Sequence, residues 1–130
     1  LRHFSLKKNS NTGSSVIIVS SVMSILGQKG KVGYCSSKSA ILGLVKSAAL
    51  ELSQREIRVN AISPGVVETP MTENLFSQLS SENIHQIKSM HPLGLGKVED
   101  IYNAIEFLLS NRSRWITGQN LIIDGGYSIS

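Results

Sequence analysis

The sequence predicts an α/β fold built on a parallel sheet, and three consecutive segments carry this prediction. The first, Val16 to Val19, is a short run of β-branched residues, which is typical of a strand buried on both faces. The second, Tyr34 to Ser53, has apolar residues at helical spacing, and the third, Ile57 to Ile62, has the character of another strand. A strand, a helix and a strand in this order form a βαβ unit, whose strands run parallel.

The residues before the first strand indicate that the fold begins further upstream. Leu1 is not an initiator methionine, and Leu1 to Lys8 resembles the last turns of a helix already under way. Asn9 to Ser14 is a polar turn that contains Gly13, the usual punctuation between a helix and a strand. We therefore expect part of the same domain to precede this chain.

The predicted helix from Tyr34 to Ser53 has one apolar side. Its apolar residues fall at helical steps and form the expected buried stripe: Ile41, Leu44, Val45, Ala48 and Leu52. Small residues crowd the first turns, which would allow a cofactor or a second helix to approach closely. The loop before the helix carries spaced glycines, Gly27, Gly30 and Gly33, and is expected to be mobile.

After the second strand, Pro64 and Gly65 end the sheet ladder, because proline has no N–H to donate. The polar stretch from Thr72 to Met90 follows, with helical fragments at Asn74 to Leu79 and at Glu82 to Met90. Its position directly downstream of the proline–glycine turn is where a lid over a substrate would lie.

A second helix is predicted from Val98 to Ser110, and a last strand from Asn120 to Ile123. Glu99 and Asp100 favour the positive N-terminal end of that helix. Its expected buried face consists of Ile101, Ala104, Ile105, Leu108 and Leu109. The chain is therefore expected to supply about three strands with flanking helices.

Composition narrows the function classes. The chain has 130 residues, 41% of them hydrophobic, and a net charge of +4, so it forms one domain at most. No basic stripe with interleaved aromatic residues is present, which argues against nucleic-acid binding. The single cysteine excludes an internal disulfide, and His3, His85 and His91 are isolated from any second metal ligand. Without a signal peptide or an apolar run of about 20 residues, we expect a cytoplasmic chain that does not enter a membrane.

Three polar residues point to a proton-transfer site. Tyr34 and Lys38 are four residues apart, so they share one face of the predicted helix and the ammonium can lie beside the phenol. A nearby positive charge favours the phenolate, which suits a group that donates and removes protons. The strand end supplies a serine, and because Ser20 and Ser21 point to opposite faces, only one of them can face the phenol.

The pattern of these residues resembles the active-site signature of the short-chain dehydrogenase/reductase family. The signature is Tyr34-x-x-x-Lys38, with Ser21 on a strand end upstream. Two further segments match the family in order, Asn60 to Thr69 and Ile116 to Gly126. The resemblance covers nearly the whole chain and looks most like the 3-oxoacyl-carrier-protein reductase branch of the family.

The resemblance implies an oxidoreductase that interconverts a carbonyl and a secondary alcohol with NAD or NADP as cofactor. Tyr34 would act as general acid and base in contact with cofactor and substrate, and Lys38 would assist it and hydrogen-bond the cofactor ribose. Ser21, which the family spacing favours over Ser20, would donate to the substrate oxygen. The substrate would be a small carbonyl or alcohol compound, with acyl thioesters among the candidates.

In the same family, the segment that corresponds to Pro64 to Thr69 lies along the nicotinamide. The resemblance implies that the backbone N–H and C=O of Val67 hold the carboxamide and that the Thr69 hydroxyl adds a contact. Pro64 and Gly65 would form the turn there, because glycine permits close approach of the backbone to a ligand.

The resemblance also predicts what this chain lacks. No G-x-G-x-x-G follows a strand, so residues 1–130 are expected to be the C-terminal, catalytic half of a Rossmann-type doubly wound parallel sheet without its dinucleotide-binding half.

The resemblance further implies that the helix from Tyr34 to Ser53 packs on its counterpart in a partner subunit and forms a homo-oligomer. Two other hypotheses stay open: an inert truncated fragment, and a dimerisation module built on that helix.

Overall fold

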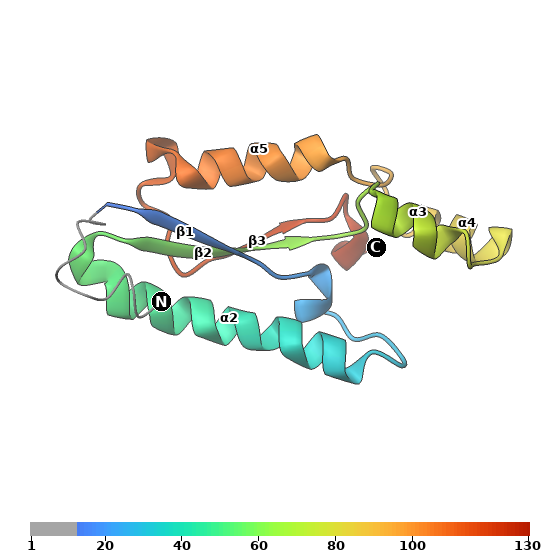
Figure 1. The fold of residues 1–130 in the computed structure, drawn as a ribbon, viewed down its shortest axis with the longest axis horizontal. Helices are drawn as coiled ribbons and strands as arrows, with labels where there is room; N and C mark the ends of the chain where they lie inside the picture. Colours follow the sequence, from blue (N-terminus) through green and yellow to red (C-terminus); the bar gives the residue numbers. More distant parts are fainter. Residues whose placement is uncertain (1–12) are drawn as a thin grey trace.

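The computed structural model describes residues 13–130, so Leu1 to Lys8 and His3, for which the sequence makes predictions, lie outside the described residues. The main elements are β1 (Ser15–Val19), α2 (Val32–Leu52), β2 (Arg58–Pro64), α5 (Val98–Leu109) and β3 (Asn120–Ile123). The strands form one parallel sheet in the order β1-β2-β3. Figure 1 shows α2 on one face of this sheet and α5 on the other. The predicted α/β fold class, with three parallel strands and flanking helices, is confirmed.

Short helices and 3₁₀ turns make up the other elements of the described chain. They are η1 (Val22–Ser24), η2 (Ser53–Arg55), α3 (Pro70–Phe76), α4 (Ser81–Ser89), η3 (Asn111–Ser113) and η4 (Tyr127–Ile129). Figure 1 shows α3 and α4 projecting together from one end of the sheet, where the sequence predicts a lid. In residues 13–130, no helix combines the length and the hydrophobicity that crossing a bilayer requires.

Helix α3 begins earlier than the sequence predicts. The expected fragment starts at Asn74, whereas the helix starts at Pro70. Thr69 caps it, because its Oγ1 accepts a hydrogen bond from the N–H of Thr72 at 3.3 Å. Proline is favoured at the first helical position, where its missing N–H costs nothing. The local chemistry of Thr69 and Pro70 therefore sets the start of this helix.

The register of the sheet brings the carboxyl ends of the strands to one edge. Val19, the last residue of β1, lies opposite Ile62, and Pro64, the last residue of β2, lies opposite Ile123. The N–H of Ser20 extends the ladder by donating to the carbonyl oxygen of Ile62 at 2.8 Å. The segments that follow β1 and β2 therefore start from neighbouring positions, at the edge where open parallel sheets bind ligands.

The core lies between the C-terminal half of α2 and β2. Its buried residues are Val45, Ala48, Ala49, Leu52, Ile57, Val59 and Ala61. The prediction that Leu44 is buried is wrong, because this side chain is 45% exposed, whereas Ala49 is 4% exposed. At about 100° per residue, Leu44 lies roughly a quarter turn from the centre of the buried face. The buried face is therefore rotated toward Ala49.

Helix α5 is fastened to the sheet near its C-terminal end. Leu108 is buried, and its carbonyl oxygen accepts hydrogen bonds from Ser15 Oγ and Arg58 Nη2, each at 2.8 Å. Leu109 is 53% exposed, so the prediction that it is buried is wrong. It follows Leu108 by about 100° of rotation, so both cannot face the sheet. The other residues of the predicted face are half-buried: Ile101, Ala104 and Ile105.

Asn60 joins the middle of β2 to the segment that leads into β3. Its side chain is fully buried. Its Nδ2 donates to the carbonyl oxygen of Ile116 at 2.9 Å, and its Oδ1 accepts from the N–H of Gln119 at 3.0 Å. This amide therefore satisfies two backbone groups that the sheet ladder does not pair.

Replacing Asn60 by leucine should lower the free energy of unfolding by about 1–3 kcal/mol, because the N–H of Gln119 loses its partner in the interior. The carbonyl of Ile116 would keep only its hydrogen bond from Arg58 Nη1 at 3.3 Å. Urea denaturation followed by circular dichroism measures this change. Asn103→Leu, at an exposed position of α5, is the matched control and should change stability by less than about 0.5 kcal/mol. An equal effect of the two substitutions would contradict the role given to Asn60.

Candidate active site

The residues predicted to be catalytic lie where β1 ends and α2 begins. Ser20 and Ser21 directly follow β1, and Tyr34 and Lys38 fall in the first two turns of α2. The turn between these elements is fastened to the helix, because Ser39 Oγ donates to the carbonyl oxygen of Ser24 at 2.8 Å. The beginning of α2 is therefore held against the segment that carries the serines.

Lys38 lies between the phenol ring and the end of the strand. Its Nζ is 5.8 Å from the centroid of the Tyr34 ring, as their spacing on the helix predicts. The same Nζ donates to the carbonyl oxygen of Val19 at 3.4 Å. Lys38 is half-buried, whereas Tyr34 is 46% exposed. The structure thus fixes a positive charge beside a phenol that a ligand can approach.

Ser20 and Ser21 differ in what their hydroxyls do. Ser20 is buried, and its Oγ donates to the carbonyl oxygen of Lys38 at 3.0 Å. Ser21 Oγ accepts from the N–H of Met23 at 3.2 Å, which leaves its own proton free to donate. Within residues 13–130, the hydroxyls of Ser21 and Tyr34 make no hydrogen bond to each other. Of the two serines, Ser21 is the one with a donor that a substrate could use.

Gly65 lies too close to the end of β3 for a larger residue. A Cβ at this position would be 2.9 Å from the Cα of Asp124, a distance that real Cβ atoms avoid. The N–H of Gly65 also donates to the carbonyl oxygen of Ile123 at 2.9 Å. The sequence predicts that glycine here allows a cofactor to approach, but its contact with Asp124 is sufficient to require it. Pro64 ends β2 as predicted.

The backbone of Val67 is held from two sides. One side is a short parallel bridge to Gly96, in which the N–H of Glu68 donates to the Gly96 carbonyl oxygen at 2.8 Å. The other is Thr72, whose Oγ1 donates to the carbonyl oxygen of Val67 at 2.6 Å. Thr72 also engages Thr69, since their hydroxyls lie 3.1 Å apart. Among the described residues, the N–H of Val67 has no hydrogen-bond partner.

Two charged side chains near the sheet have pKa values shifted from their ordinary ones. Burial raises the pKa of Asp124, but hydrogen bonds from Ser128 and Gly126 outweigh it, so the net pKa lies below the usual range. Burial lowers the pKa of Arg58, whose guanidinium donates to backbone carbonyls at the end of α5. Asp124 therefore acts as an ionised acceptor that fixes the turn after β3. Nowhere in residues 13–130 do three or more potential metal ligands gather.

A cavity of about 450 Å³ opens beside the Pro64–Thr69 segment. Its lining comes from the turn after β2, the residues just before α5, the first turns of α5 and the turn after β3. None of the residues predicted to be catalytic lines it. The cavity thus lies on the α5 side of the sheet, whereas Tyr34 and Lys38 belong to α2.

Two residues of this region have roles that the sequence does not predict. Thr72 contacts both Val67 and Thr69, and the Thr69–Pro70 helix start is the signal that could have placed it there. His91 is 3% exposed and accepts a hydrogen bond from the N–H of Val66. It packs in the interior, and Val66 lies too far from it along the chain for sequence spacing to reveal this contact.

Comparison with known proteins gives matches over nearly the whole chain. A family model described as enoyl-(acyl carrier protein) reductase matches residues 3–128. A 3-oxoacyl-[acyl-carrier-protein] reductase of Thermotoga maritima is 44% identical over 116 residues, which are 88% of this chain and 46% of that protein. The protein of the same name from Rickettsia bellii is 38% identical over 92% of this chain and 48% of its own length. The chain thus spans about half the length of the curated relatives it matches.

Solved structures share the fold. A short chain dehydrogenase family protein from Francisella tularensis superposes with a TM-score of 0.83 at 31% identity, covering 92% of this chain and 52% of that one. A 4-hydroxyisoleucine dehydrogenase superposes with a TM-score of 0.84 at 38% identity, covering 91% of this chain and 48% of that one. The extent of the family match, together with the shared parallel sheet, shows that this chain belongs to the short-chain dehydrogenase/reductase family.

Proposed function

We propose that this chain is the catalytic part of an NAD- or NADP-dependent oxidoreductase that interconverts a carbonyl compound and a secondary alcohol. The observation that carries the proposal is the Lys38 ammonium, held 5.8 Å from the centroid of the Tyr34 ring at the carboxyl edge of the sheet. Lys38 also donates to the carbonyl oxygen of Val19, which holds its ammonium near the end of β1.

In this proposal, Tyr34 is the general acid and base. Its phenol protonates the oxygen of a carbonyl substrate during reduction and removes the proton of an alcohol in the reverse reaction. The Lys38 ammonium lies beside this ring, 5.8 Å from its centroid. Ser21 donates its free hydroxyl proton to the same substrate oxygen and stabilises the charge that develops there. A bound nicotinamide supplies or accepts the hydride.

The segment after β2 has groups that fit a nicotinamide cofactor. The N–H of Val67 is unpaired within the described residues, and its carbonyl oxygen, which accepts one hydrogen bond, can accept a second. Val67 would hold the carboxamide, with Thr69 and the Pro64–Gly65 turn beside it, and Lys38 would hold the ribose. Two similar solved proteins support this choice of cofactor. The 4-hydroxyisoleucine dehydrogenase is complexed with NADH, and ElxO, 36% identical, has NADP bound.

We propose a small carbonyl or alcohol compound as substrate, with acyl thioesters as the first candidates. The Thermotoga maritima relative is named for the reduction of 3-oxoacyl groups on acyl carrier protein. The lid helix α3 leaves two apolar side chains exposed, Met71 at 83% and Leu75 at 48%. An apolar surface of this kind suits the hydrocarbon part of an acyl chain.

Tyr34→Phe should lower kcat by a factor of about 10²–10⁴, the usual contribution of a general acid or base. The change removes only a hydroxyl from a half-exposed ring, so the circular dichroism spectrum and the Tm should stay the same. Turnover is measured from nicotinamide absorbance in the full-length protein, with NADH and NADPH against β-keto thioesters and simple ketones.

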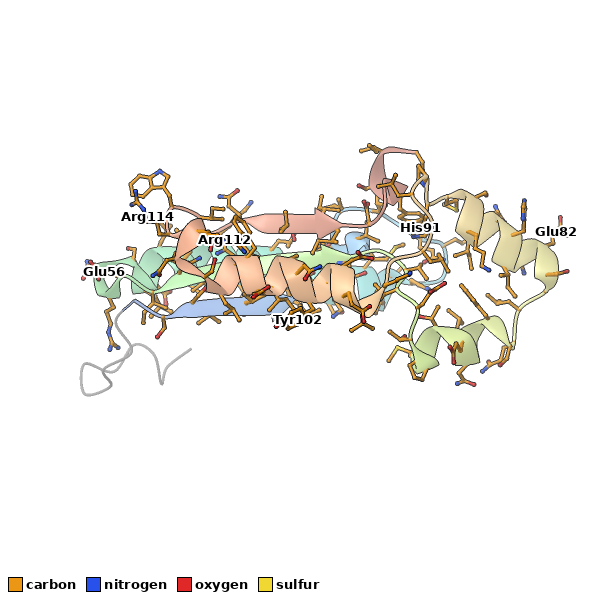
Figure 2. The ribbon with its side chains drawn as sticks, turned by 90° about the horizontal axis from the view of Figure 1, so that it is seen from above. Glu56, Glu82, His91, Tyr102, Arg112 and Arg114 are labelled. Carbon is orange, nitrogen blue, oxygen red and sulfur yellow. The ribbon has the colours of Figure 1, made fainter. Side chains whose placement is uncertain are left out.

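Tyr102→Phe is the matched control for this experiment. Tyr102 lies on α5, is 60% exposed and is labelled at the flank of this helix in Figure 2. Its loss of a hydroxyl should leave kcat within about twofold of the parent value. Full turnover by Tyr34→Phe, or an equal loss in both variants, would remove Tyr34 from the mechanism.

We propose further that residues 1–130 form one partial domain, the catalytic half of a longer enzyme that carries its dinucleotide-binding half elsewhere. The chain spans about half of its relatives, at 46% of the Thermotoga maritima protein. Within residues 13–130, β1 pairs only with β2, so its other edge has no strand beside it. An unpaired edge of this kind is normally covered by a neighbour.

The chain alone should therefore bind NADH and NADPH weakly or not at all, because it lacks a segment to hold the pyrophosphate. Titration followed by nicotinamide fluorescence measures this, with the full-length protein as the positive control. Micromolar binding by the 130-residue chain would show that the missing half is not needed.

We also propose that the full-length protein is a homo-oligomer that uses the outer side of α2. Leu44 and Leu50 of this helix are 45% and 77% exposed and make no contribution to the core cluster. Exposed apolar side chains on one helix are typical of an interface between subunits. Light scattering should give a mass that is a multiple of the subunit mass, and a purely monomeric protein would contradict this.

A further inference from the structure

His91 connects the end of the lid to the segment after β2. It directly follows Met90, the C-cap of α4, and is 3% exposed. Its Nδ1 lies 2.8 Å from the carbonyl oxygen of Ile87, and its Nε2 lies 3.2 Å from the backbone N of Val66. Its ring stacks on that of Tyr127, with centroids 4.8 Å apart. Figure 2 shows His91 between the sheet and the projecting helices α3 and α4.

The partners of His91 determine where its proton is. A backbone N–H can only donate, so Nε2 must accept the hydrogen bond from Val66. Nδ1 then carries the proton and donates it to the carbonyl oxygen of Ile87. A cationic imidazole would turn a second donor toward the N–H of Val66. The two hydrogen bonds therefore assign Nδ1 as the donor and Nε2 as the acceptor.

The backbone N–H of Val66 uses His91 as its hydrogen-bond acceptor. Among the described residues, the N–H of Val66 has no other acceptor. Its carbonyl oxygen accepts from the N–H of Gly96 at 3.0 Å, which fixes the opposite side of the same residue. Thr72, at the start of α3, holds the carbonyl of the next residue, Val67. The two ends of the lid thus hold adjacent residues of one short backbone segment.

We propose that His91 is a positioning residue for the cofactor: through its hydrogen bond to Val66 it fixes the backbone that presents the N–H of Val67 to the nicotinamide carboxamide. This inference rests on the proposed function, which assigns the carboxamide to Val67. Because His91 also holds the last turn of α4 through Ile87, it links the position of the lid to the shape of the cofactor site.

The test compares variants that keep or remove the acceptor at Nε2. His91→Phe keeps a ring to stack on Tyr127 but loses both hydrogen bonds, whereas His91→Gln places an amide oxygen near the position of Nε2. His85→Phe, at an exposed position of the same helix α4, is the matched control. All variants are made in the full-length protein, and KM for NADH or NADPH is measured separately from kcat.

His91→Phe should raise the KM for the nicotinamide cofactor about tenfold, with kcat within about twofold of the parent value, since the Tyr34 site is untouched. His91→Gln should restore KM to within about threefold, and His85→Phe should leave it unchanged. If His91→Phe does not fold, His91→Asn takes its place, because its shorter amide can serve Ile87 but does not reach Val66. The proposal would be overturned if His91→Gln had the same KM as His91→Phe (or as His91→Asn, where that variant is used). A loss confined to kcat would also overturn it.

A second measurement does not depend on activity. Hydrogen exchange of the Val66 amide, followed by NMR with ¹⁵N-valine labelling, should become about tenfold faster in His91→Phe and stay near the parent rate in His91→Gln. Unchanged exchange in His91→Phe would refute the contact itself. If the parent protein shows neither turnover nor cofactor binding, the proposed function fails, while the exchange rates still decide whether His91 holds Val66.

Discussion

The structure of this chain depends on a reciprocal pair of hydrogen bonds between the end of β1 and helix α2. Ser20 Oγ donates to the backbone carbonyl of Lys38, and Lys38 Nζ donates to the carbonyl of Val19. The fully buried side chains of α2 all lie at Val45 or beyond, and Ile41 and Leu42 pack against the same core while partly buried. The hydrophobic core therefore fixes mainly the middle and the C-terminal half of the helix. Polar contacts fix its first turns instead. That division leaves the phenol of Tyr34 exposed to a ligand while the Lys38 side chain beside it is held to the strand end.

The end of β1 with the start of α2 is one part of the candidate site, and the segment that follows β2 is the second. Gly65 packs against Asp124, and the next residues are held by backbone hydrogen bonds to Gly96 and by the side chains of Thr72 and His91. Because β1 and β2 are parallel neighbours, both parts start from the same edge of the sheet. One part carries Tyr34 and Lys38, and in the other the N–H of Val67 has no partner among the described residues. The proposed reaction needs both at one edge, since the group that moves the proton and the bound nicotinamide must reach the same substrate.

Local patterns in the sequence predict the βαβ unit and the meeting of Tyr34 with Lys38, because both follow from the period of a helix or strand. The same patterns place Leu44 and Leu109 wrongly. A period shows that a helix has an apolar side, but the sheet that packs against it decides how that side is rotated. The early start of α3 has a local signal in Thr69 and Pro70. The role of His91 has no local signal in the sequence, because Val66 and Tyr127, which it contacts, lie far from it along the chain.

The proposed reaction requires the strand end and the helix to bring Ser21 and Tyr34 to the same substrate oxygen. The most direct measurement is a crystal structure of the full-length protein with a nicotinamide cofactor and an unreactive substrate analogue. We expect Ser21 Oγ and the Tyr34 hydroxyl each to lie within about 3 Å of the analogue's oxygen, with Lys38 still bound to Val19. An analogue oxygen bound out of reach of Tyr34 would contradict the account.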